Sequence, residues 1–191
     1  MNPYGEVVTE NYSGIATVNG HSYANYRTKN TNFALLVSEK FTEPFKEPIA
    51  YGQHVARLAN MLGGGVLVQR FGDLLDGRRS TPERIKSSIL TPTLSCATPG
   101  DLSLVLPYRQ LTAIIEMLYA LDKIAPGTAS RYTLLYGIEV KFYSGRVKLT
   151  NELETEGVKN LFAIGDGAGV TRGLIQASAS GVHAARVICS R

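Results

Sequence analysis

The chain has 191 residues, of which 44% are hydrophobic and 19% charged, and its formal net charge is +4. This composition excludes an intrinsically disordered chain, and no apolar stretch approaches the roughly 18 to 20 residues that cross a bilayer. The basic residues are scattered, which disfavours a nucleic-acid-binding protein, because such proteins concentrate Lys and Arg in a stripe or patch.

The first part of the chain predicts short β-strands. Residues 6–9, 14–18 and 33–38 are rich in apolar and β-branched side chains and are separated by Gly, Asn and Pro. Asn19-Gly20 is a turn signal between strands. We therefore expect a β-meander near the N-terminus.

Two helices follow, with an irregular segment between them. Residues 48–62 carry apolar side chains at helical spacing, and the glycines at 63–65 end that helix. Residues 66–109 have the composition of loops and turns. A second apolar face runs over 111–121 and is closed by Pro126-Gly127.

The last part of the chain predicts a strand, a loop and a helix. After possible strands over 132–143 and 146–150, a short apolar strand over 158–165 runs into a loop of Gly and Asp. A helix is expected over 172–188, and its many small residues predict close packing against a sheet.

The loop of this unit has the features of a ligand site. Gly165, Gly167 and Gly169 allow tight turning and a close approach of a ligand to the backbone. The N-terminus of the next helix offers unpaired N–H groups and a partial positive charge, and Asp166 can accept hydrogen bonds from a sugar hydroxyl. The alternative is an ordinary tight turn with a helix cap, which many α/β proteins contain.

A resemblance narrows this choice. The string NLFAIGDGAG at residues 160–169 resembles the second FAD-contacting motif of the glutathione-reductase-like flavoproteins. Residues 135–186, and the N-terminal stretch that starts at Pro3, are similar to one largely uncharacterised branch, the NAD(FAD)-utilising or FAD-dependent dehydrogenases.

The resemblance implies a set of cofactor contacts. The acid at position 166 would bind the ribityl chain of FAD, the glycines would let the cofactor pass over the backbone, and the helix start would face the N1/C2 edge of the flavin. The implied cofactor-binding residues are Gly165, Asp166, Gly167, Ala168, Arg172, Gly173, Leu174 and Ile175.

Members of that branch are longer, and an earlier segment carries the GxGxxG turn that holds the adenosine half of FAD. This chain lacks that fingerprint, so the resemblance implies a C-terminal portion. The expected fold is α+β: a substrate-binding domain over 1–150 with a mixed β-sheet and flanking helices, and the last strand–helix unit of a Rossmann-like FAD domain over 151–191. The N-terminal FAD-binding segment would be the missing partner.

Four further residues are candidate substrate contacts. Arg27, Asn30 and Asn32 lie in a polar segment that either faces the flavin and substrate or forms a solvated loop. Arg146 either contacts a ligand or pairs with a neighbouring acid. Three isolated histidines and two distant cysteines predict no metal site, and no nucleophile–base pair is present.

The sequence thus predicts a fragment of a cytoplasmic FAD-dependent oxidoreductase that acts on a small molecule by hydride transfer, with NAD(P) as a possible electron partner. The fragment is expected to be inactive alone and to bind FAD weakly or not at all. Two alternatives remain: a non-catalytic module that assembles with a separate FAD-domain chain, and a relative of the tRNA-modifying flavoproteins.

Overall fold

The computed structural model of the protein describes residues 2–141 and 145–191. The chain divides into two compact units, Met1–Val140 and Lys141–Arg191. The sequence placed a boundary at residue 150. The roles of substrate domain and FAD domain assigned to the two parts stay predictions.

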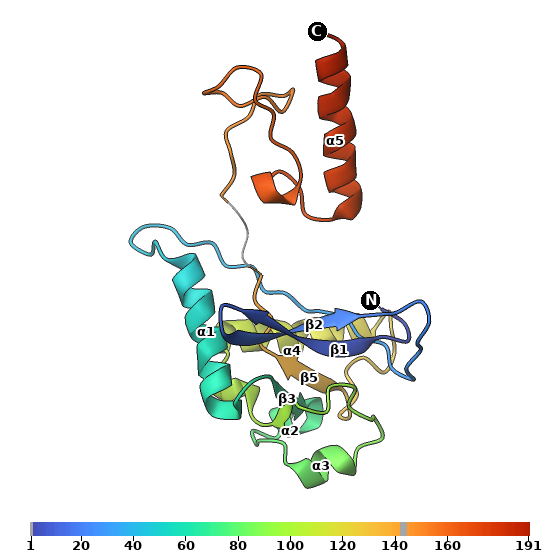
Figure 1. The fold of residues 1–191 in the computed structure, drawn as a ribbon. Helices are drawn as coiled ribbons and strands as arrows, with labels where there is room; N and C mark the ends of the chain where they lie inside the picture. The colour runs from blue at the N-terminus through green and yellow to red at the C-terminus, as the bar shows by residue number, and fades with distance from the viewer. Residues whose placement is uncertain (1, 142–144) are drawn as a thin grey trace. The chain divides into compact units, whose positions relative to one another are not determined.

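A hairpin opens the first unit (Figure 1). β1 (Glu6–Tyr12) and β2 (Ile15–His21) pair antiparallel along their whole length. The chain reverses at Ser13 and Gly14, which have φ angles of 53° and 83°. The N–H of Gly14 donates a hydrogen bond to Asn11 Oδ1 over 2.8 Å, which fixes the turn.

The expected turn at Asn19-Gly20 is wrong, because both residues pair within β2. The side chain of Asn19 donates to Glu10 Oε1 across the hairpin at 2.6 Å. Gly20 is needed for a different reason: a Cβ there would lie 2.7 Å from Asn32 Oδ1. Asn19 and Gly20 therefore contribute to packing within the hairpin region and do not reverse the chain.

A three-stranded mixed sheet forms the centre of the first unit. β3 (Leu67–Arg70) lies between β4 (Thr98–Pro99), which is parallel to it, and β5 (Leu134–Gly137), which is antiparallel. The expected strand over 132–143 is thus confined to β5, and residues 142 and 143 lie outside the described residues. The α+β class is confirmed.

The helices of the first unit are α1 (Pro48–Gly63), α2 (Phe71–Leu75), α3 (Pro82–Lys86), the 3-10 turn η1 (Leu102–Leu104) and α4 (Tyr108–Asp122). Two of them, α1 and α4, follow the apolar periodicity of the sequence, whereas α2, α3 and η1 lie within residues 66–109, where only loops and turns were expected. Gly64 ends α1 in the left-handed conformation with φ 70°, so the predicted glycine stop is confirmed.

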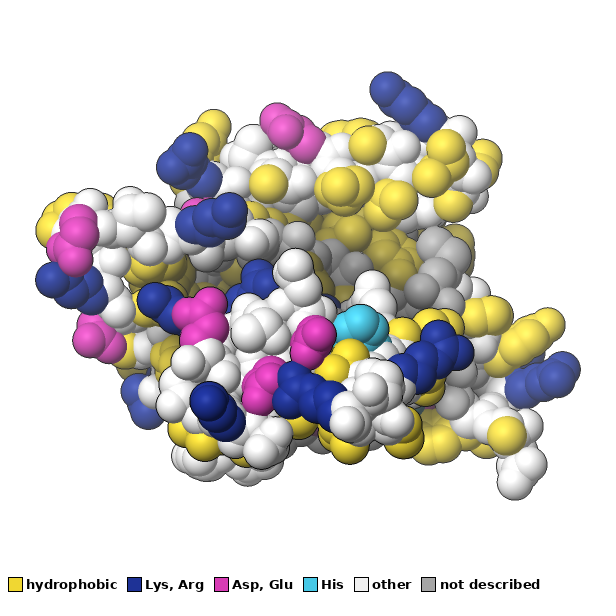
Figure 2. Space-filling view, turned by 90° about the horizontal axis from the view of Figure 1, so that it is seen from above, with side chains coloured by type: hydrophobic (Ala, Val, Ile, Leu, Met, Phe, Trp, Pro, Cys, Tyr) yellow, Lys and Arg dark blue, Asp and Glu magenta, His cyan; other side chains and the backbone are white. Residues whose placement is uncertain are grey.

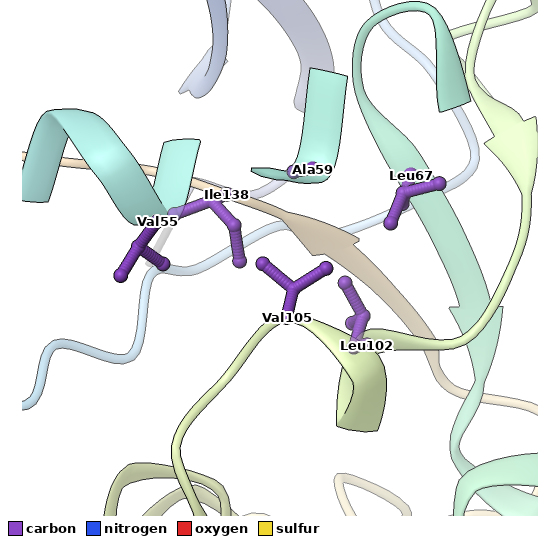
Figure 3. Packing of buried hydrophobic residues seen from close by; sticks show 6 residues of the cluster. All are labelled: Val55, Ala59, Leu67, Leu102, Val105 and Ile138. Carbon is purple, nitrogen blue, oxygen red and sulfur yellow. The ribbon is translucent and has the colours of Figure 1, made fainter. Parts of the chain in front are cut away.

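One core cluster joins α1 to the sheet. Figure 3 shows Val55 and Ala59 of α1, Leu67 of β3, and Leu102, Val105 and Ile138 converging from separate segments. In a second cluster, the side chains of Phe33 and Leu35 pack against Phe71 and Leu118. The expected strand over 33–38 is therefore wrong: the segment forms no strand, because its apolar side chains are used in packing.

The second unit contains the 3-10 turn η2 (Asp166–Ala168) and α5 (Leu174–Cys189). The helix expected over 172–188 is confirmed within two residues. The strands expected over 146–150 and 158–165 are reduced to isolated bridges, Leu149 with Thr155 and Glu154 with Phe162. In the described parts of the chain, no helix has the length and apolarity needed to span a membrane.

Candidate functional site

The loop between Gly165 and Gly173 is shaped by four glycines. Gly165, Gly169 and Gly173 have φ angles of 73°, 69° and 139°, and residues with a side chain rarely adopt such values. Gly167, within η2, meets nothing within 4 Å of an added Cβ. The backbone at Gly167 is therefore open to solvent.

Asp166 holds this loop against the start of α5. Its carboxylate accepts a hydrogen bond from Thr171 Oγ1 at 2.5 Å and from the N–H of Gly173 at 3.1 and 3.2 Å. The side chain remains exposed. Asp166 therefore ties the loop to the start of α5.

Ser180 fixes the loop from within α5. Its hydroxyl accepts the N–H of Gly165 at 3.0 Å and donates to the carbonyl of Ala177 at 2.7 Å. The Ser180 side chain is buried. A Cβ at Gly181 would lie 3.7 Å from Ile164, so small residues on this face let the helix pack closely under the loop.

The first turn of α5 is open to solvent. No side chain caps this helix. Leu174 and Ile175 are 88% and 85% exposed, which is unusual for large apolar side chains. The first N–H groups of a helix have no partner within it, so this end offers both donors and an apolar surface. Ala168 and Arg172, also predicted contacts, lie within the same loop.

Arg146 lies beside the loop. Its Cα would be 2.9 Å from a Cβ on Gly169, and the N–H of the next residue, Val147, donates to Ala168 O at 3.4 Å. In the described residues no acid pairs with the Arg146 side chain, so the structure offers no support for the ion-pair alternative. The adjoining Tyr143 and Ser144 lie outside the described residues.

We expect the substitution Gly169→Ala to destabilise the second unit by about 1 to 3 kcal/mol, because the new Cβ would adopt a strained φ and meet the backbone of Arg146. Gly167→Ala is the matched control, since its Cβ enters open space. Thermal unfolding followed by circular dichroism measures both. Equal melting temperatures for the two variants would contradict the geometry.

Ion pairs at the end of α5 hold the rest of the second unit together. Arg191 pairs with Glu152 at 2.8 Å and with Glu154, and its guanidinium lies 5.1 Å from the centre of the Phe162 ring. The hydrogen bond from Arg191 holds the pKa of Glu154 below its usual value. His183 Nε2 lies 3.1 Å from the carbonyl oxygen of Asn151.

The first unit contains a cavity of about 900 Å³. Asn30 and Asn32 line it, and their role as substrate contacts stays a prediction. Asn30 also donates to the carbonyl of Thr91 at 2.8 Å. The amide of Asn32 instead ties the hairpin together, donating to Glu6 O at 2.6 Å. Arg27 does not line the cavity; its guanidinium lies 5.0 Å from the centre of the Tyr4 ring.

The described residues contain no cluster of His, Cys, Asp and Glu that could hold a metal ion. Both cysteines are free. On the face drawn in Figure 2, Lys and Arg side chains are interspersed with acidic ones rather than gathered in a stripe.

Sequence reasoning missed Ser180, Thr171 and the cavity. Ser180 acts on a loop 15 residues away, and only a helix folded back under that loop shows this contact. Thr171 lies near Asp166 in sequence, and the Asp-x4-Thr spacing was a signal that could have found it. The cavity is lined from segments that span most of the first unit, so no local pattern encodes it.

Two comparisons with known proteins identify relatives. A protein of Clostridium beijerinckii, described as uncharacterized, is 32% identical over 203 residues; the alignment covers the whole of this chain but 37% of that protein. The chain therefore spans little more than a third of the relative's length. Residues 1–142 match the family described as FAD-dependent protein, C-terminal domain-like. This match covers most of the chain and all of the cavity, and the chain belongs to that family.

Proposed function

We propose that this chain is the C-terminal portion of an FAD-dependent oxidoreductase, a dehydrogenase that transfers a hydride between a small organic molecule or a nicotinamide nucleotide and the flavin. In this proposal the loop at 165–173 contacts FAD, and an N-terminal segment of the same protein holds the adenosine half. The chain alone is then inactive and binds FAD weakly or not at all.

The observation that supports the proposal most strongly is the loop at Asp166. Its open glycine backbone, its accessible carboxylate and the uncapped start of α5 fit the middle of an FAD molecule. The family match ends at residue 142, so the loop is an independent argument for the same cofactor.

The residues of this loop would have separate roles. Asp166 would orient the ribityl chain by accepting a hydroxyl hydrogen bond, while Gly167 leaves room for the cofactor over the backbone. The N–H groups of Leu174 and Ile175, at the positive end of α5, would stabilise negative charge at a ring carbonyl. Their exposed side chains would cover the ring edge and exclude water. Bound FAD would supply the two-electron chemistry itself.

The Rossmann-like strand over 158–165 belongs to this proposal. A strand needs neighbours that satisfy its backbone N–H and C=O groups, and this unit provides a single bridge at Phe162. We expect the segment to become a full strand when the N-terminal FAD segment supplies the adjacent strands.

A titration of FAD with the purified chain, followed by quenching of flavin fluorescence, tests the division of the cofactor site. We expect no saturation at micromolar protein, because the adenosine contacts are absent. The same titration with a polypeptide that includes the N-terminal segment should saturate, and that protein should be yellow. A colourless longer protein that takes up no FAD would overturn the proposal.

A further inference from the structure

The cavity of the first unit is lined by β5. Every residue of β5 and the following Ile138 line it, and so do residues 33–35. Leu111 and Ile114 of α4 contribute aliphatic walls. The volume of about 900 Å³ lies in the range of sites that enclose small organic molecules.

Hydrogen bonds at the end of β3 show which way the backbone of β5 faces. The N–H of Phe71, directly after β3, donates to the carbonyl of Thr133 at 2.8 Å, so the carbonyl of Thr133 points toward β3. Residues of an antiparallel strand alternate between facing their partner strand and facing away from it. Leu135 therefore faces β3, and Leu134 and Tyr136 direct their N–H and C=O groups to the outer edge.

Contacts on the far side of β3 agree. Val68, opposite Tyr136, accepts a hydrogen bond from Gly100 N–H at 2.9 Å, on the side of β4. Arg70, opposite Leu134, donates its N–H to Ser80 Oγ at 2.8 Å. The carbonyl of Val68 and the N–H of Arg70 thus point away from β5, as the alternation requires.

The outer edge of β5 is closed at one end and open along the cavity. The carbonyl of Ile138 accepts the N–H of Val18 at 3.2 Å, so β2 covers that end. Within the described ranges 2–141 and 145–191, no group hydrogen-bonds the outward N–H or C=O of Leu134 or Tyr136. Backbone N–H and C=O groups at the open edge of a strand can pair with a ligand that offers a matching acceptor and donor.

We propose that this cavity binds a planar aromatic molecule that carries a cis-amide edge, such as a lactam or a carboxamide, paired with the N–H and C=O of Tyr136. In an extended strand these two groups of one residue point the same way, so they match a neighbouring acceptor and donor. The aliphatic walls suit the flat apolar body of such a molecule.

The surroundings of Tyr136 favour an uncharged ligand. Burial raises the pKa of its phenol to about 12. The phenol oxygen is buried and has no hydrogen-bond partner. A neutral lactam avoids the desolvation cost that a carboxylate would meet here.

Calorimetric titration of the chain with carbostyril (2-quinolinone) tests the proposal. We expect saturable one-to-one binding, and at least tenfold weaker binding of N-methylcarbostyril, which has the same rings but lacks the N–H donor. Equal binding of the two compounds, or no saturable binding of carbostyril, would overturn the proposal.

Two variants test whether carbostyril binds in this cavity. Ala34 lines the cavity and is exposed, so Ala34→Trp should fill the space and weaken carbostyril binding at least tenfold without disturbing the core. Leu36→Trp, in the same segment but outside the lining, is the control and should bind normally. Circular dichroism shows whether each variant is folded, and a folded Ala34→Trp protein with unchanged affinity would overturn the assignment.

The same titration with a capped, extended hydrophobic peptide separates two uses of a strand edge. Peptide binding without carbostyril binding would mean that β5 accepts a strand, and the proposal would fail. These assays contain no flavin. Their failure would therefore leave the assignment of the loop at Asp166 untouched, and a failed FAD titration would leave the cavity proposal standing.

Discussion

Replacing Asp73 by alanine is expected to lower the free energy of unfolding of the first unit by about 3 kcal/mol, because it breaks a buried charge network. The carboxylate is 1% exposed. It accepts hydrogen bonds from Arg78 Nε at 3.0 Å and from Ser80 Oγ at 2.8 Å, and Arg84 approaches to 4.0 Å. Ser80 in turn accepts the N–H of Arg70, so the network fixes the end of β3.

Urea unfolding followed by circular dichroism measures this loss. Asp76→Ala is the matched control: Asp76 pairs with Arg78 at 3.0 Å and Arg131 at 2.6 Å, yet it lies at the surface. Exposed pairs contribute little, so its effect should be much smaller. The Arg131 hydrogen bond lowers the pKa of Asp76, so the control's contribution is present at neutral pH and fades as the pH falls through that lowered pKa. Equal losses for the two variants would contradict the burial argument.

Asp166→Ala in the longer flavoprotein is expected to reduce FAD retention at least tenfold. The substitution removes both the proposed acceptor of the ribityl hydroxyl and the contacts to Thr171 and Gly173 that order the loop. Flavin absorbance per mole of purified protein, and the dissociation constant after removal and re-addition of FAD, measure the effect.

Three further variants separate cofactor contact from loop order. Asp166→Asn keeps one acceptor oxygen and should retain part of the affinity. Thr171→Val disturbs loop order alone and should have a smaller effect than Asp166→Ala. Glu156→Ala removes an exposed acid of the same unit and should retain FAD normally. Full FAD retention by Asp166→Ala would show that the loop does not contact the cofactor.

Local sequence signals predicted those elements whose stability is local. α1 and α4 follow from apolar periodicity with clear ends, because a helix satisfies its own backbone. The glycine and aspartate pattern likewise predicted the loop before α5, since positive φ angles depend on residue type. The strands were predicted less well, because pairing depends on partners elsewhere in the chain. The apolar residues 33–38 and 158–165 both have strand composition, but neither finds a partner strand in the described structure.

By itself, the sequence determined the α+β class, the three long helices, the loop at Asp166 and the resemblance to FAD-dependent proteins that the family match then supported in part. Only the tertiary structure decided that Ser180 anchors Gly165, that Asn32 ties the hairpin together, and that β5 lines a cavity. The physical reason is distance along the chain. Each of these features joins groups that are far apart in sequence, and such contacts exist only once packing has brought the segments together.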